Sequence, residues 1–241
     1  MLHGAIENSR IFYNEKGRGL GCFLADRGFD VTCADFAGRG LSSPQASRRF
    51  NHSQQQLICL DIPALIHHLY QQHQQPVVVI AHSWAGVVLA ASLARFPELQ
   101  PKVKAIITFG SKRVISVGGF KKRLHIDLVW NRFSPLLCRF YGYLPAKQWR
   151  FGADNEPAQY LLDTIGWIRG QAFVDPQAVQ CRGLSPGVRM QAVRDTEYLL
   201  QAAKQVHGVG RRPMGHRLGK TQQGQGVAEH GRIERVLADT A

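Results

Sequence analysis

The segment from Pro76 to Ala90 joins a strand to a helix through a single serine. An apolar, β-branched run ends at Ser83, and an apolar helical stretch follows at once. Alanines stand two residues before and two residues after this serine, where a side chain larger than methyl would collide with the backbone of a sharp turn. The pattern predicts a strand–turn–helix unit that raises the hydroxyl above the end of a sheet. The alternative is a serine that caps a helix after a buried strand.

Helices and strands are expected to alternate from residue 9 to residue 110. Apolar periodicity predicts helices over 9–27, 53–72 and 84–96, and strands over 29–35, 76–81 and 103–109. Alternation of this kind implies parallel crossovers in one sheet, with ligands bound outside the carboxyl ends of the strands. The sequence therefore predicts an α/β fold with a doubly wound, mostly parallel sheet and with Ser83 at its ligand-binding edge.

The chain is expected to divide into three parts: a first core part over 1–112, a helical cap insertion over 113–185, and a second core part over 186–241. The cap segment breaks the alternation and contains eleven aromatic residues. It would cover Ser83 and supply an apolar pocket, although the same aromatics could fill its own core. Residues 188–193 predict one more strand, whereas 199–241 contain no aromatic residue and are poorly patterned.

Charge and composition narrow the function classes. The formal net charge of +13 would suit nucleic acid or an anionic surface, but the basic residues form no stripe with interleaved aromatics, so no nucleic-acid partner is expected. No apolar run approaches the roughly 18 residues of a membrane span, and the first residues do not resemble a signal peptide. The five cysteines are widely spaced, which favours reduced thiols over a metal site. These features predict a cytoplasmic protein without a cofactor or metal.

Three blocks of sequence resemble the α/β-hydrolase superfamily. They are Leu2-His3-Gly4-Ala5, the loop from Ala34 to Ser42 with its Gly-x-Gly-x-Ser pattern, and the serine segment from Ala81 to Gly86. Their order is that of an oxyanion loop, an aspartate-led glycine loop and a nucleophile elbow. The resemblance is specific over residues 1–110. It departs at the two ends, because only Met1 and Leu2 precede His3 and because 199–241 lack apolar content.

The resemblance implies a serine hydrolase with a catalytic triad in the order serine, acid, histidine. Ser83 is the expected nucleophile, and Asp195 is the expected acid because it follows the predicted strand 188–193, with Glu197 as the fallback. His230 is the expected base, ahead of His216 and His207, and residues 232–237 are expected to form the closing helix after it. The amides of Ala5 and Trp84 are expected to hold the oxyanion.

The expected substrate is a small molecule with an ester-like carbonyl, processed through an acyl-enzyme as in serine esterases and lipase-like enzymes. The second hypothesis is a catalytically impaired hydrolase-like protein that binds a ligand or partner through its cap. A dinucleotide-dependent oxidoreductase is disfavoured, because Gly38-Arg39-Gly40 lacks the third glycine of a G-x-G-x-x-G motif.

Overall fold

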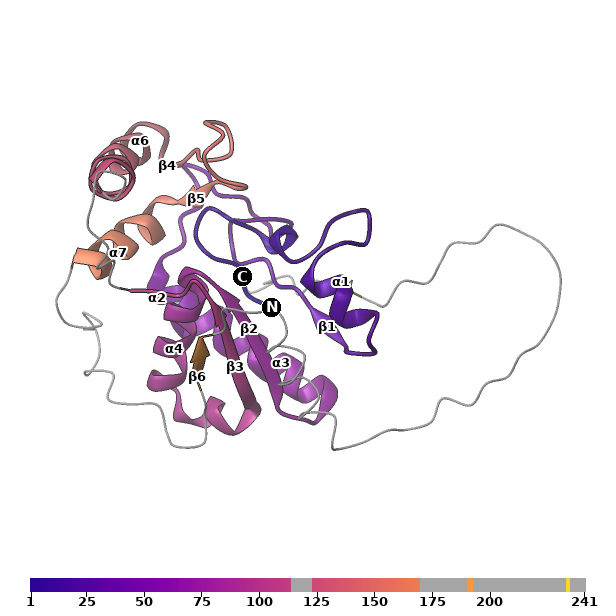
Figure 1. The fold of residues 1–241 in the computed structure, drawn as a ribbon. Coiled ribbons are helices and arrows are strands. Elements are labelled where there is room, and N and C mark those ends of the chain that lie inside the picture. Colours follow the sequence, from indigo (N-terminus) through magenta and orange to yellow (C-terminus); the bar gives the residue numbers. More distant parts are fainter. Residues whose placement is uncertain (114–122, 170–189, 193–232, 235–241) are drawn as a thin grey trace, which may run out of the picture.

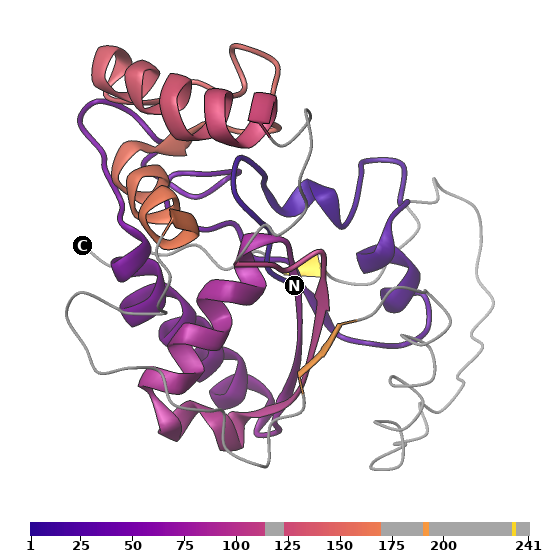
Figure 2. The ribbon, with the colours of Figure 1, turned by 60° about the vertical axis from the view of Figure 1, so that its left-hand side comes forward.

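A computed structural model describes residues 1–113, 123–169, 190–192 and 233–234 of the chain. A parallel sheet forms its centre, with helices on both faces (Figure 1, Figure 2). Strands β2 (Val77–His82), β3 (Val103–Phe109) and β6 (Met190–Ala192) pair in that order. On the other side, β1 (Val31–Thr32) pairs with β7 (Ile233–Glu234).

Leu2 connects these two groups of strands. It forms parallel bridges to Ala34, just after β1, and to Ala81 in β2. Its amide donates to the Ile80 carbonyl at 2.8 Å, and its own carbonyl accepts from the His82 amide at 2.9 Å. The chain therefore runs outward from Leu2 to β1 and then returns across Leu2 to β2. This reversal is a topological switch point, the place where open α/β sheets bind ligands.

Helices cover the two faces as that reversal requires. Helix α1 (Leu20–Ala25) connects Leu2 to β1 on one face. On the other face, α2 (Gln54–Gln56), the π-helical turn η2 (Leu57–Asp61) and α3 (Ile62–His73) lead to β2, and α4 (Trp84–Arg95) leads to β3 (Figure 2). Right-handed crossovers place the connections on opposite faces when the direction of strand addition reverses.

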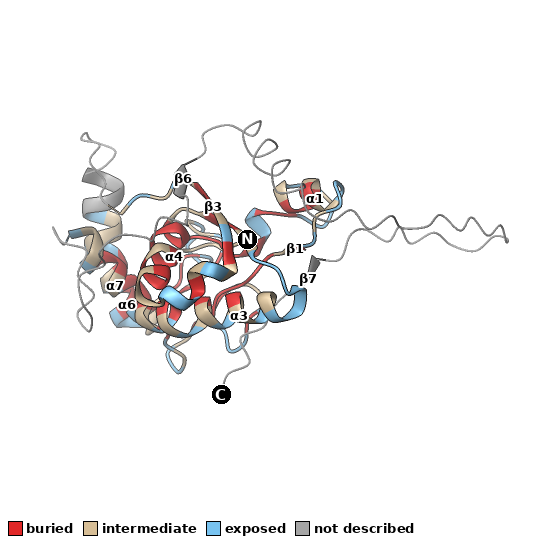
Figure 3. Ribbon diagram, turned by 90° about the horizontal axis from the view of Figure 1, so that it is seen from below, coloured by how far each residue is buried: buried red, intermediate tan, exposed pale blue. Residues whose placement is uncertain are grey.

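Side chains alternate along β2 between two apolar cores. Val79 and Ala81 join the larger core beneath α3 and α4, and Ile80 joins the smaller core beneath α1. Strand residues alternate between faces with a period of two, so a strand buried on both faces is apolar throughout. The buried residues accordingly gather between the layers (Figure 3).

A further layer lies at the carboxyl ends of the strands (Figure 1). It comprises the π-helical segment η4 (Arg123–Phe133), α6 (Ser134–Tyr141), the short strands β4 (Tyr143–Leu144) and β5 (Glu156–Pro157), and α7 (Ala158–Arg169). Its own apolar cluster includes Leu137, Leu144, Leu161 and Ile165, with Ile6 packed against it. Among the described helices, none is long and apolar enough to cross a membrane.

The strands predicted over 76–81 and 103–109 are confirmed, and β6 lies within the predicted 188–193. The single helix predicted over 9–27 is wrong, because the structure has a 3-10 turn η1 (Ser9–Ile11), a loop and then the short α1. Asn14 Oδ1 accepts from the Lys16 and Arg18 amides, and Gly19 adopts φ +128°, so local turn geometry replaces the helix.

A helix expected over 232–237 is also wrong in part. Ile233 and Glu234 form β7, which pairs in parallel with β1. Pairing with the open edge of β1 outweighs the weak helical periodicity of so short a segment. The remaining residues of that prediction lie outside the described part of the chain.

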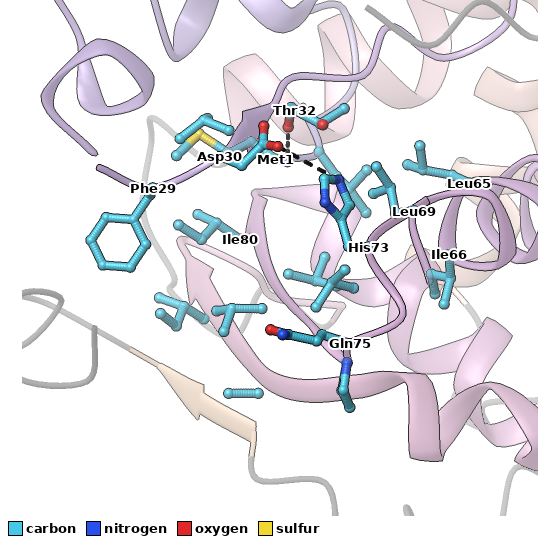
Figure 4. A pocket seen from close by; sticks show the side chains of 18 of the residues that line it. Met1, Phe29, Asp30, Thr32, Leu65, Ile66, Leu69, His73, Gln75 and Ile80 are labelled. Atoms are coloured by element: carbon cyan, nitrogen blue, oxygen red, sulfur yellow. Dashed lines mark hydrogen bonds and ion pairs between the residues drawn. The ribbon is translucent and has the colours of Figure 1, made fainter. Parts of the chain in front are cut away.

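An apolar cavity of about 320 Å³ lies between the start of β1 and the start of β2 (Figure 4). At its wall the Met1 ammonium donates to the Thr32 carbonyl at 2.6 Å, and the Ala34 amide donates to the Met1 carbonyl at 3.1 Å. Met1 therefore pairs beside β1 as a strand residue would, but its nitrogen is an ammonium and not a peptide amide. Burial lowers the pKa of this ammonium. The cavity is at the amino ends of the strands, away from Ser83.

An extension that fills this cavity is expected to stabilise the fold. Adding Val-Ile-Val-Ile before Met1 would continue its ladder between β1 and β2 and would remove a buried charge. We expect the free energy of unfolding to rise by about 2 kcal/mol or more, since several apolar side chains become buried. Denaturant titration measures the change. The control is Gly-Ser-Gly-Ser, which removes the charge without filling the cavity, and equal stability of the two extensions would contradict the prediction.

Candidate active site

Ser83 occupies a strained turn between β2 and α4. Its backbone has φ 53° and ψ −125°, a conformation that non-glycine residues rarely adopt. The Ser83 amide donates to the Phe109 carbonyl at 2.7 Å, which anchors the turn to the end of β3. The side chain is partly exposed, while Ala81 and Ala85 on either side are fully buried. The predicted strand–turn–helix geometry is therefore present, and the serine is reachable from solvent.

The loop after Leu2 lies directly against this serine. A methyl group placed on Gly4 would come within 2.8 Å of Ser83 Cβ and within 3.2 Å of the His82 carbonyl oxygen. Only glycine fits this approach without displacement. The loop that contains Ala5 therefore lies beside the serine.

His3 fixes the orientation of the peptide group between Gly4 and Ala5. The Phe36 amide donates to His3 Nε2 at 3.1 Å, so Nε2 carries no proton and Nδ1 donates to the Gly4 carbonyl at 2.9 Å. Burial, together with the nearby Arg39 guanidinium, lowers the pKa of His3 to about 4, so the ring is neutral near pH 7. In a trans peptide the N–H points away from the C=O. The Ala5 N–H therefore points away from the His3 ring.

Trp84 supplies the second expected donor. It is the first residue of α4, and amides in the first turn of a helix have no acceptor within that helix. Its indole donates to Gln54 Oε1 at 2.6 Å, and the ring is buried in the larger core. The buried Trp84 indole therefore holds the backbone of this residue, including its amide, in a fixed position. Trp84 thus directly follows Ser83, and the loop that contains Ala5 approaches the same serine through Gly4.

Replacing Gly4 by alanine is expected to damage this arrangement. The new methyl group would collide with Ser83 Cβ and with Glu7 Oε2, which lies 2.9 Å from the same point. If the displaced Ala5 amide has the oxyanion role that the resemblance implies, we expect kcat to fall on the order of 10²-fold with little change in KM, because removing one oxyanion donor costs about that much. Steady-state kinetics on a p-nitrophenyl ester tests this. Gly166→Ala is the control, since Gly166 lies within helix α7 and its methyl group would meet nothing within 4 Å, and equal kinetics of the two variants would contradict the prediction.

Asp35 shapes the glycine loop from Ala34 to Ser42, the second of the three blocks. Its Oδ1 accepts from the Ser9 amide at 2.6 Å, and its Oδ2 accepts from the Leu41 amide at 2.9 Å. Gly40, at φ +57°, has no room for a side chain because a Cβ would overlap the Asp35 carboxylate. The loop therefore folds around this carboxylate, and Asp35 is a structural residue.

Two ion pairs that contact the loop around Ala5 were not predicted. Glu7 Oε2 accepts from the Gly4 amide at 2.8 Å and forms an ion pair with His82 Nδ1 at 2.8 Å. Glu156 forms a fully buried ion pair with Arg39 and accepts from the Ile6 amide. The sequence gives little signal for the second pair, because its members are 117 residues apart.

The expected acid and base lie outside the described residues. This applies to Asp195 and His230 and also to the alternatives Glu197, His207 and His216. The described histidine beside the serine, His82, has Nδ1 bound to Glu7. Within the described part of the chain, no cluster of three or more histidine, cysteine, aspartate or glutamate side chains could hold a metal ion.

Comparison with known proteins identifies a family and a structural neighbour. The family model described as serine aminopeptidase, S33, matches residues 1–135. No curated protein matches the chain. Among solved structures, the chain is similar to an extracellular α/β-hydrolase from a Paenibacillus species, at 15% identity and a TM-score of 0.45. The match covers 66% of this chain and 66% of that one.

Proposed function

The chain belongs to the serine aminopeptidase S33 family of α/β hydrolases, and we propose that it cleaves ester-like carbonyl substrates with Ser83 as the nucleophile. The single observation that carries this proposal is the strained Ser83 turn, which lies against the Gly4–Ala5 loop. Strain at a partly exposed serine is costly and serves no packing purpose there. It is what a nucleophile elbow requires.

In the proposed reaction Ser83 Oγ attacks the carbonyl carbon while a histidine accepts its proton. The carbonyl oxygen becomes an oxyanion that the Ala5 and Trp84 amides bind. When the tetrahedral intermediate collapses, the alcohol leaves with the proton from the imidazolium, and an acyl-enzyme remains. Water then releases the acid by the same steps. We propose His230 as the base and Asp195 as the residue that orients it.

The proposed substrate class rests on the layer above the strands. Ile6, next to Ala5, packs against the apolar cluster of that layer, so apolar side chains adjoin the oxyanion loop. Such surroundings favour an apolar acyl or alcohol group over a charged one. We propose that this layer is the cap of the active site. Phe140 and Trp149 within it are 73% and 49% exposed, so these two aromatics do not fill the layer's own core.

The experiment is activity-based labelling with a fluorophosphonate, followed by identification of the modified residue. We expect labelling at Ser83 and hydrolysis of short p-nitrophenyl esters. Amino-acid p-nitroanilides test the aminopeptidase alternative that the family description names, and faster turnover of those would overturn the ester assignment. Absence of both labelling and hydrolysis in folded protein would favour an impaired hydrolase-like protein that binds a ligand.

A further inference from the structure

One carboxylate links the two loops that meet at the serine. Glu7 Oε2 accepts hydrogen bonds from the Gly4 amide and from His82 Nδ1, each at 2.8 Å. Gly4 precedes the oxyanion residue Ala5, and His82 is the last residue of β2, directly before Ser83. The link continues the sheet contact between the same segments, where the His82 amide donates to the Leu2 carbonyl.

The carboxylate also lies close to the reacting groups. A methyl group on Gly4 would be 2.9 Å from Glu7 Oε2 and 2.8 Å from Ser83 Cβ, so both border the same small space. The side chains of Glu7 and His82 are 23% and 31% exposed, which leaves both able to exchange protons with solvent. An unpaired carboxylate at this distance would repel the negative charge that develops on the substrate oxygen.

We propose that Glu7 and His82 are positioning residues, an ion pair that holds the Ala5 amide against Ser83 and cancels the carboxylate charge beside the oxyanion. This inference rests on the proposed function. Neither residue transfers a proton to the substrate in this scheme. Glu7 acts through the Gly4 amide, and His82 acts through the charge of Glu7.

The pair has a defined pH dependence. The hydrogen bond to Glu7 raises the pKa of His82 above 6.5, against the opposing effect of burial. Its contribution is therefore complete below pH 6.5 and is lost as the pH rises through the raised pKa. The other described groups whose charge Glu7 affects are His3 and Tyr160. Both are neutral near pH 7, because burial lowers the pKa of His3 to about 4 and raises that of Tyr160.

The test compares fluorophosphonate labelling of Ser83 in the parent and in three variants over the neutral and alkaline range. In the parent we expect a rate that rises with deprotonation of the catalytic base and then falls as His82 loses its proton. Glu7→Gln keeps an acceptor but removes the charge, so the alkaline fall should disappear. His82→Gln keeps a donor and leaves the carboxylate charged, so the rate should be low at every pH. Glu7→Ala removes the link, and the rate should fall on the order of 10²-fold.

Two readouts separate this inference from the proposed function. Nuclear magnetic resonance titration of the His82 ring should give a lower pKa in Glu7→Gln than in the parent, whether or not the protein is active. Glu15→Gln is the matched control, since it removes an exposed carboxylate paired with Arg10 and should behave as the parent in both measurements. An alkaline fall that persists in Glu7→Gln, or parental labelling of Glu7→Ala, would overturn the positioning role alone. A parent that is not labelled at all would overturn the proposed function and this inference with it.

Discussion

Replacing Ser83 by alanine is expected to abolish labelling and to reduce ester hydrolysis by roughly 10⁴-fold or more, with the folded state intact. The size of the loss follows from the proposed mechanism, because without the hydroxyl no acyl-enzyme forms and only the oxyanion site and substrate binding contribute. The side chain is partly exposed, so alanine leaves neither a buried cavity nor an unpaired buried group. Steady-state kinetics and thermal unfolding measure the two effects separately.

A glycine at the same position gives a sharper result. At φ 53° and ψ −125° a serine backbone is strained, and glycine relieves that strain. We expect Ser83→Gly to be as inactive as the alanine variant but more stable than the parent by about 1 kcal/mol. The alanine variant is the control, because it keeps the Cβ and with it the strain of the positive φ. Loss of stability in Ser83→Gly would contradict a strained nucleophile turn.

The fold and the serine turn were predictable because their signals are local. Strands β2 and β3 are rich in apolar and β-branched residues, and Ser83 lies at the junction of a strand with a helix, so the local sequence pattern predicts both. The division of 9–27 was not predictable in this way. Asn14 and Gly19 can each stand inside a helix at some cost in propensity. Only the structure shows that the Asn14 side chain closes a loop by accepting from the Arg18 amide, so that the helix begins at Leu20.

The ion pairs of the site were beyond sequence reasoning for a different reason. Glu7, His82, Arg39 and Glu156 are ordinary charged residues whose partners come from other elements. Their roles depend on these contacts, which arise because the switch point brings the loop after Leu2 beside Ser83 and because the same loop contacts Glu156 of β5 through the Ile6 amide. Motifs therefore predicted a candidate nucleophile and a candidate oxyanion loop, whereas the residues that contact this loop became visible only in three dimensions.

The Arg39–Glu156 pair is expected to have the largest effect on stability. Both side chains are fully buried, and Arg39 Nε donates to Glu156 Oε1 at 2.5 Å. The guanidinium carbon lies 4.2 Å from the centre of the Tyr160 ring, and Glu156 Oε2 accepts from the Ile6 amide at 2.5 Å. The pair thus joins the glycine loop, β5, α7 and the segment after Ala5. Burial raises the pKa of Glu156, and the guanidinium opposes that rise.

Glu156→Gln is expected to lower the free energy of unfolding by about 3–5 kcal/mol, because it leaves the Arg39 charge buried without a partner. The amide oxygen of the new side chain still accepts from Ile6, so the loss reports on the charge and not on that hydrogen bond. Denaturant unfolding measures it, and a loss of this size is a large share of the stability of a typical domain.

The double variant Arg39→Met/Glu156→Gln decides whether the loss comes from the uncompensated charge. Removing the guanidinium as well takes away the cost of an unpaired buried cation, so the double variant should recover most of the stability lost in Glu156→Gln. Glu15→Gln breaks the exposed pair with Arg10 and should cause no measurable change. If the double variant is as unstable as Glu156→Gln alone, the pair stabilises the fold through its packing against Tyr160 and not through charge compensation.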